Sequence, residues 1–205
     1  MHSRSAPAPD AEAAREAYAA ILGMWVFLAS ELLLFAALLT LYAAYRVHHP
    51  DAFAEGIRRS LKLSGSVNTL LLLVSSWCVA TATGHAEAAR PRAARRHLLA
   101  AMALGLGFLA LKAHEYGHHI AQGLVPGSRA HASTPGLSLF FTLYYALTGL
   151  HAVHVAVGLG VLAAMALRVH RWRPHAIEAG ALYWHLVDVV WIILWPLFYL
   201  TGGPS

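Results

Sequence analysis

The segment KAHEYGHHI, at positions 112–120, contains the spacing H-E-x-x-H in His114, Glu115 and His118. On a helix this spacing places two imidazoles one turn apart, with a carboxylate beside them. Two such histidines can bind one Zn²⁺ while the glutamate activates the metal-bound water. The motif is therefore consistent with a zinc hydrolase, and the rest of the chain decides whether that chemistry fits.

Other polar side chains interrupt long apolar segments, where a charge at mid-bilayer costs about 3 kcal/mol or more. Glu31 lies near the centre of the first segment, with Ser30 as its adjacent polar neighbour. We expect this carboxyl group to be protonated or to have a partner on another helix, and to act in proton handling. In the last segment, His185 and Asp188 are one turn apart, which predicts a hydrogen-bonded pair.

The segment LTGLHAVHVAVGLG carries a third polar pattern. Helical spacing places Thr148, His151, His154 and Gly158 along one stripe. Small and polar residues are typical of closely packed helix faces in membranes, where they form interhelical hydrogen bonds. The stripe therefore predicts an inward-facing helix surface.

The amino-acid composition indicates whether these residues lie in water or in a membrane. Of 205 residues, 58% are hydrophobic and only 12% are charged, which indicates a membrane protein. The single cysteine, Cys78, excludes an intramolecular disulfide. The net charge of +5 arises from arginines grouped in predicted loops, a pattern that suits membrane orientation, and no nucleic-acid partner is expected.

Apolar stretches of about 20 residues or more predict membrane-spanning helices. Five stretches meet this length, so we predict an all-α integral membrane bundle of five helices over residues 19–200. A polar cytoplasmic tail, residues 1–18, precedes it, and a short tail, residues 201–205, follows. The helices are expected at about 19–45, 67–84, 98–121, 137–167 and 176–200.

Lys and Arg residues, which are retained on the cytoplasmic side, indicate the orientation. The N-terminal tail and the second and fourth loops hold nine of them, against five in the first and third loops. This distribution predicts a cytoplasmic N-terminus and a C-terminus outside, although the first loop departs from the rule with four positive charges.

Four motifs, in order, resemble subunit III of the haem-copper oxidases. GMWVFLASELLLF is similar to the family's G-M-x-x-F-x-x-S-E-x-x-x-F, with Glu31 at its membrane carboxylate. NTLLLLVSS, which starts at Asn68, is similar to the family's signature of the next helix. ALTGLHAVHVAVGL and YWHLVDVVWIILWPLFYL are similar to the motifs of the last two helices. The resemblance covers nearly the whole chain after the tail, in a five-helix form that lacks the first two helices of longer members.

This resemblance also bears on the H-E-x-x-H spacing, because the family carries an E-Y pair matched by Glu115 and Tyr116. An intramembrane zinc protease using His114, Glu115 and His118 is the alternative from another class, but the chain offers no convincing third ligand. A di-iron desaturase would need about eight ligands on one side of the membrane, whereas the histidines lie at different depths. Lys112 stands where many family members carry glutamine.

The resemblance implies an accessory subunit of a proton-pumping terminal oxidase in a bacterial inner membrane. Haem and copper would lie in partner subunits I and II, and this chain would have no cofactor of its own. It would pack on subunit I, hold structural phospholipids and support proton uptake. The electron donor would be cytochrome c or a quinol, and the accessory protein of a nitric oxide reductase is a related alternative. The residues expected at structural polar contacts and interfaces are Asn68, Glu115, Tyr116, Thr148, His151, His154, His185 and Asp188.

A histidine cluster is a separate hypothesis that depends on the predicted topology. The first and third spanning helices would end on the same side, near Asp51 and Glu55. Were the helix ends close, imidazoles and carboxylates there would bind Zn²⁺ or a similar ion. The residues of this candidate metal site are His48, His49, His118, His119 and His131.

Overall fold

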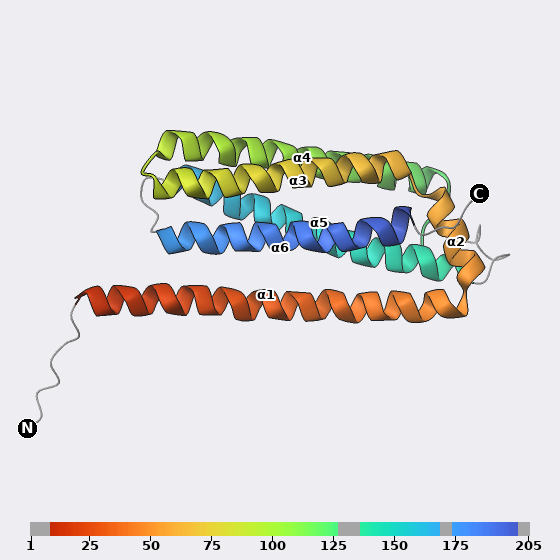
Figure 1. Cartoon of the computed structure of the whole chain (residues 1–205). Coiled ribbons are helices and arrows are strands. Elements are labelled where there is room, and N and C mark those ends of the chain that lie inside the picture. The colour runs from red at the N-terminus through yellow and green to blue at the C-terminus, as the bar shows by residue number, and fades with distance from the viewer. Residues whose placement is uncertain (1–8, 127–135, 169–173, 201–205) are drawn as a thin grey trace, which may run out of the picture.

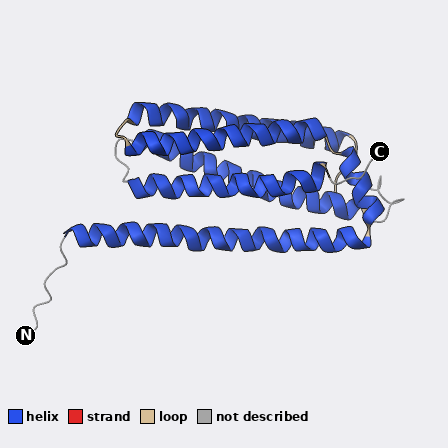
Figure 2. Cartoon of the chain, in the orientation of Figure 1, coloured by secondary structure: helices blue, strands red, loops and turns tan. Residues whose placement is uncertain are grey.

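The computed structural model describes residues 9–126, 136–168 and 174–200, and within these ranges it contains helices and no strand (Figure 2). The helices are α1 (Pro9–His48), α2 (Pro50–Arg59), α3 (Lys62–Glu87), α4 (Pro91–Ala121), α5 (Leu137–Arg168) and α6 (Pro174–Tyr199). All except α2 contain a segment long and apolar enough to cross a membrane. The predicted all-α bundle with five spanning helices is confirmed.

The five long helices lie roughly parallel or antiparallel in one elongated bundle (Figure 1). At one end, here called the arginine end, α3 finishes and α4 begins, with Arg90 just before α4 and Arg92, Arg95 and Arg96 in its first turns. At the opposite end, here called the α2 end, the short helix α2 lies across the bundle (Figure 1). Which end faces the cytoplasm stays a prediction.

Helices α1, α3 and α4 start well before their apolar stretches. Helix α1 begins at Pro9, α3 at Lys62 and α4 at Pro91, where we expected starts at 19, 67 and 98. The 40 residues of α1 extend over about 60 Å, roughly twice the hydrocarbon thickness of a bilayer, so its first turns project beyond the membrane. The other residues of the predicted tails, 1–8 and 201–205, lie outside the described residues.

Helix α2 was not predicted, because its residues lie between two apolar stretches, where we expected a loop. Pro50 occupies its first turn, where a missing N–H costs nothing, and Asp51 lies at the favourable end of the helix dipole. Its inner face is apolar, with Phe53 and Ile57 fully buried. Phe53 contacts the rings of Tyr42 and Phe140 edge-on, at centroid distances of 5.2 and 5.5 Å.

Helices α4, α5 and α6 pack closely around a tryptophan. Trp184 of α6 is fully buried, and it lies against Gly105 of α4 and Gly158 of α5. A methyl group on Gly158 would come within 2.7 Å of the indole ring. The predicted role of Gly158 in close helix packing is therefore confirmed.

Candidate functional site: two polar clusters inside the bundle

The carboxyl group of Glu31 on α1 pairs with His154 on α5. Its Oε2 lies 2.9 Å from His154 Nε2, and the two side chains are 17% and 13% exposed. His154 Nδ1 lies 2.8 Å from the Leu150 carbonyl, which can only accept a hydrogen bond. Nδ1 therefore carries a proton and donates it to that carbonyl.

This arrangement determines what the Glu31–His154 pair can do. With Nδ1 protonated, a neutral imidazole can only accept at Nε2, and a carboxylate can also only accept. The 2.9 Å contact therefore needs one further proton, held either by the histidine or by the glutamic acid. The pair thus forms a one-proton site between two helices.

Helix α6 also contacts this pair. Tyr183 of α6 donates a hydrogen bond of 3.1 Å to the His154 carbonyl. The ring of Phe35, which lies on α1, meets the His154 imidazole edge-on at 5.3 Å. The structure confirms that Glu31 has a partner on another helix. Glu31 and His154 were both predicted as polar residues inside the bundle, but not as a pair, and Tyr183 was not predicted.

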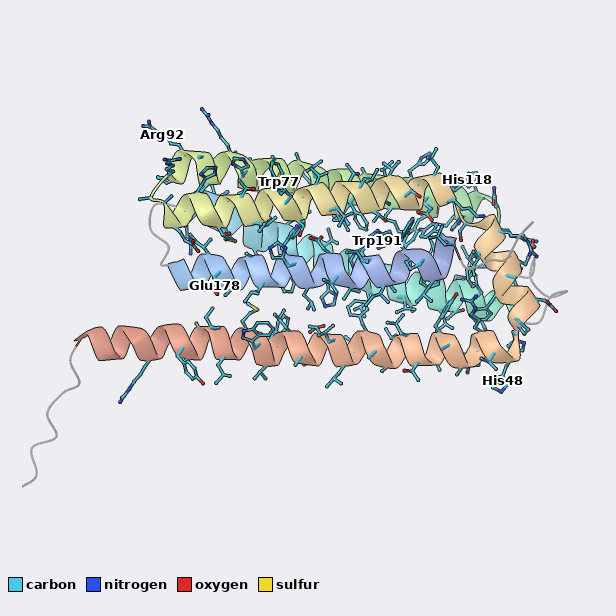
Figure 3. The ribbon with its side chains drawn as sticks, viewed as in Figure 1. His48, Trp77, Arg92, His118, Glu178 and Trp191 are labelled. Carbon is cyan, nitrogen blue, oxygen red and sulfur yellow. The ribbon has the colours of Figure 1, made fainter. Side chains whose placement is uncertain are left out.

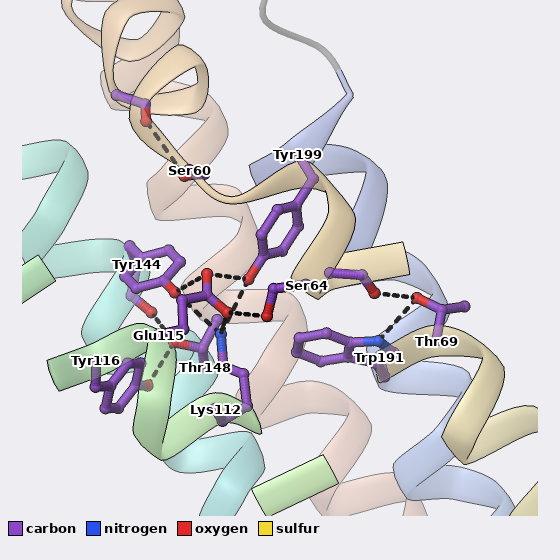
Figure 4. A network of polar contacts seen from close by, with 12 residues as sticks. Ser60, Ser64, Thr69, Lys112, Glu115, Tyr116, Tyr144, Thr148, Trp191 and Tyr199 are labelled. Atoms are coloured by element: carbon purple, nitrogen blue, oxygen red, sulfur yellow. Dashed lines mark hydrogen bonds and ion pairs between the residues drawn. The ribbon is translucent and has the colours of Figure 1, made fainter. Parts of the chain in front are cut away.

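A second cluster, near the α2 end, surrounds a buried ion pair (Figure 4). Lys112 Nζ lies 3.2 Å from Glu115 Oε2, and the two residues are 2% and 0% exposed. Tyr144 and Tyr199 each donate a 2.7 Å hydrogen bond to Glu115 Oε1. The Ser64 hydroxyl donates to Oε2 at 3.4 Å, so helices α3, α4, α5 and α6 meet at one carboxylate.

The Lys112 ammonium group is equally well surrounded. It donates hydrogen bonds of 3.0 Å to the hydroxyls of Tyr144 and Tyr199. Four aromatic rings also lie within cation–π distance of Nζ, between 4.9 and 5.7 Å, from Tyr116, Tyr144, Trp191 and Tyr199. This role of Lys112 was not predicted, although the i, i+3 spacing of Lys112 and Glu115 within an apolar helix indicates an ion pair.

Other predicted polar residues also lie inside the bundle. Tyr116 and Thr148 join α4 to α5 through a 2.7 Å hydrogen bond. Thr148 donates its own proton to the Tyr144 carbonyl, so the phenol is the donor to Thr148. The His151 ring packs between Phe108 and Trp191. Asn68 and His151 are fully buried, and their side-chain nitrogen and oxygen atoms have no hydrogen-bond partner among the described residues.

The predicted hydrogen bond between His185 and Asp188 is wrong. His185 Nδ1 instead pairs with the Ser76 hydroxyl of α3 at 2.7 Å. The carboxyl oxygens of Asp188 are buried and make no hydrogen bond within the described chain, although Ser76 lies beside them. A partner on the neighbouring helix has therefore replaced the expected contact along α6.

The geometry also argues against the zinc protease alternative. His114 and His118 are exposed on the outer surface of α4, whereas Glu115 faces inward. Lys112, Ser64 and two tyrosines hold the Glu115 carboxylate on the inner side of α4. It therefore cannot activate a water molecule on a zinc ion that His114 and His118 would bind on the outer side.

The candidate histidine metal site does not form among the described residues, which contain no group of three potential ligands that could hold a metal. His48 Nδ1 contacts the Ala44 carbonyl, and His118 contacts the Gln122 side chain. Arg59 and Arg58 bond to the Glu55 carboxylate and hold its pKa below the usual range. His119 is buried against Phe141 and Tyr144, and His131 lies outside the described residues.

Comparison with known proteins identifies the family. The family model of cytochrome c oxidase subunit III matches residues 15–203. The chain belongs to the cytochrome c oxidase subunit III family. It is 31% identical to cytochrome c oxidase subunit 3 of Synechocystis over 186 residues, covering 88% of this chain and 75% of that protein. It is also 31% identical to cytochrome bo(3) ubiquinol oxidase subunit 3 of Pseudomonas putida, covering 89% of this chain and 86% of that protein.

A third relative, named a probable quinol oxidase subunit 3, comes from Staphylococcus haemolyticus and is 26% identical, with 88% of each chain covered. Family membership and the five spanning helices together identify this chain as a multi-pass membrane protein and an accessory subunit of a haem-copper oxidase. Both polar clusters therefore belong to a subunit III, and their chemistry has to be interpreted in that setting.

Proposed function

We propose that this subunit III packs on subunit I of a proton-pumping terminal oxidase and supports proton uptake through the Glu31–His154 pair. The observation that carries the proposal is the one-proton contact of 2.9 Å between α1 and α5. Haem and copper are expected in the partner subunits, and this chain contributes no redox centre. The complex is expected in a bacterial inner membrane.

The pair supports this role through its position as well as its chemistry. Both side chains remain partly exposed in the isolated chain, so a neighbouring subunit or a water file can reach them. A site that holds one proton at mid-membrane can accept or release it as the charge of a neighbouring group changes. The chain itself contributes the two side chains and holds them in contact between α1 and α5.

Lipids and the electron donor belong to the same proposal. Large apolar side chains cover the outer faces of the helices, which suits contact with phospholipids and with subunit I. Relatives are named both as cytochrome c oxidase and as quinol oxidase subunits, so either donor is compatible with the family. Purifying the intact complex and identifying its other subunits distinguishes three possibilities: a cytochrome c oxidase, a quinol oxidase and a nitric oxide reductase.

Replacing Glu31 by glutamine tests the proton-linked role. Glutamine keeps the size and hydrogen-bonding capacity of the side chain but cannot hold the shared proton. We expect the Glu31→Gln complex to assemble but to show slower turnover, fewer protons pumped per electron, or faster inactivation during turnover. The measurement is oxygen consumption and proton release by the reconstituted oxidase across a range of pH.

Ser30→Ala is the matched control for this experiment. Ser30 is the neighbouring polar residue on α1, and among the described residues its hydroxyl bonds within its own helix, to the Phe27 carbonyl. Its replacement should leave turnover and pumping unchanged. If Glu31→Gln matched the wild type in turnover, pumping and lifetime at every pH, the pair would have a packing role alone.

A further inference from the structure

Two histidines from neighbouring helices meet near the arginine end of the bundle. His85 lies in the last turn of α3 and His97 in the second turn of α4, and the centroids of their imidazole rings are 5.1 Å apart. Both side chains are half-buried, and the ring of Trp77 meets the His97 ring edge-on at 6.5 Å. Figure 3 shows Arg92 projecting from this end of the bundle. The histidine pair is therefore separate from the two polar clusters described above.

The hydrogen bonds of this pair leave ring nitrogens free to bind a metal. His97 Nδ1 lies 3.0 Å from the Ala93 carbonyl, which can only accept, so Nδ1 carries the ring proton and donates it. In the neutral imidazole, Nε2 then keeps a free lone pair. The ring nitrogens of His85 form no hydrogen bond with a described residue. Metal-binding histidines are commonly held as His97 is, with one nitrogen donating to a carbonyl and the other facing the ion.

The distance between the two rings matches a tetrahedral metal site. Zn²⁺ binds imidazole nitrogen at about 2.0–2.1 Å, which places each ring centroid about 3.2 Å from the ion. At the tetrahedral angle two such centroids are about 5.2 Å apart, whereas at the right angle of a square-planar site they are about 4.5 Å apart. The observed 5.1 Å is close to the tetrahedral value, which Zn²⁺ prefers. The rings of His118 and His119, by comparison, are 6.5 Å apart.

Charges near the pair act in opposite directions on a bound cation. The C-terminal end of α3 carries the negative end of the helix dipole, and His85 lies within its last turn, so a cation is favoured there. His97 lies beyond the first turn of α4, where the opposite dipole effect has declined. Arg92, Arg95 and Arg96 repel a cation, but their side chains are exposed and screened by solvent and salt. We therefore expect a site of moderate affinity.

We propose that His85 and His97 bind one Zn²⁺ ion, which ties the end of α3 to the start of α4. Among the described residues no third histidine, cysteine, aspartate or glutamate completes the site, so water molecules occupy the two remaining positions of the tetrahedral ion. The proposal does not rest on the role of the Glu31–His154 pair, which joins α1 to α5.

The test measures how Zn²⁺ protects single histidines from chemical modification. The complete oxidase complex is dialysed against a chelator and treated with diethyl pyrocarbonate, which modifies free imidazole nitrogens, and mass spectrometry then reports on each histidine separately. We expect Zn²⁺ to protect His85 and His97 over the same range of concentration. Mg²⁺, which prefers oxygen ligands, should protect neither. Equal protection by Mg²⁺ would overturn the proposal.

His48 provides the internal control. Its Nδ1 contacts the carbonyl four residues earlier at 2.8 Å, as His97 Nδ1 does, but its ring contacts no other imidazole among the described residues. A single histidine with this hydrogen bond should stay reactive at the Zn²⁺ concentrations that protect the pair. Protection of His48 in the same range would show that the hydrogen bond and exposure alone explain binding, and the two-histidine site would be rejected.

Reciprocal variants distinguish one shared ion from two independent contacts. His97→Gln should raise the Zn²⁺ concentration that half-protects His85 at least about tenfold, because the ion loses one of two linked ligands, and His85→Gln should do the same for His97. His48→Gln should leave both protection curves unchanged, and co-purification with the other subunits checks that each variant assembles. The site is excluded if Zn²⁺ protects neither histidine in the wild type, or if protection of one persists when the other is replaced.

Discussion

At the scale of single residues, Lys112 illustrates how a charge is kept inside this bundle. Removing an ammonium group from water costs several kcal/mol, and an ion pair compensates only when the remaining donors and acceptors are also satisfied. Here Glu115 supplies the counter-charge, two phenols accept hydrogen bonds, and aromatic faces lie around Nζ. The ion pair is therefore one part of a larger shell that joins four helices.

Breaking the ion pair should be costly. Lys112→Met leaves the buried Glu115 carboxylate with its hydroxyl donors but without a counter-charge, and we expect a loss of about 3–5 kcal/mol in stability. Thermal dissociation of this subunit from the purified complex measures the effect. Lys112→Gln retains a donor and should lose less, and Lys112→Met combined with Glu115→Leu should recover part of the loss. A stable Lys112→Met single variant would show that Glu115 is neutral.

Single residues also show where sequence analysis reaches its limit. The depth of Glu31 in an apolar segment predicted a partner, and the stripe on α5 contained that partner. Which stripe residue faces α1 depends on the rotation of α5 about its axis, which spacing alone does not determine. In the same way, spacing along α6 favoured His185 with Asp188, but Ser76 on the adjacent α3 lies closer to His185 Nδ1.

At the scale of elements, the same turn geometry occurs at the ends of α3 and α4. Ala89 and Gly123 both have positive φ, 53° and 70°. Arg90 N–H then bonds back to the His85 carbonyl at 2.8 Å, and Leu124 N–H to the His119 carbonyl at 2.9 Å. This is the usual glycine-containing end of a helix, but the first example carries alanine.

Exchanging these two residue types should have opposite effects. Alanine is strained at positive φ, so Ala89→Gly should stabilise the α3–α4 turn by about 1 kcal/mol, and Gly123→Ala should destabilise the end of α4 by a similar amount. The melting temperature of the assembled complex is the measurement. A lower melting temperature for Ala89→Gly would mean that the alanine methyl group makes a contact worth more than the strain.

Element type was easier to predict than element boundaries. Long apolar runs predicted all five spanning helices, because a membrane requires backbone hydrogen bonds to be satisfied within each helix. The polar turns at the helix starts carry no such signal, so α1, α3 and α4 extend beyond the predicted limits. Helix α2 has ten residues, too few to span a bilayer, so a search for long apolar runs passes over it, although Phe53 and Ile57 recur at helical spacing.

At the scale of the whole molecule, α1 is the least buried of the spanning helices. Of its most apolar 18-residue window, 11% is buried inside the chain, compared with 50% for α6. In Figure 1 it lies along one side of the other four long helices. Its inward polar contacts include the Glu31–His154 pair and a 3.0 Å hydrogen bond from Tyr42 to the Leu197 carbonyl. Its outer surface, with Leu33 72% exposed, suits lipid or a neighbouring subunit.

The position of α1 should therefore depend on the complex, and spin labels can measure this. Because Cys78 is the only cysteine, its replacement by alanine allows labels at Leu33→Cys and Ile193→Cys to report the separation of α1 and α6. We expect a narrow distance distribution in the assembled oxidase and a broad one in the isolated subunit in detergent. The control pair, Leu70→Cys with Ile193→Cys, joins α3 to α6 and should stay narrow in both states. Equally narrow distributions for the α1 pair would show that the chain holds α1 without its partners, through the contacts of Glu31 and Tyr42.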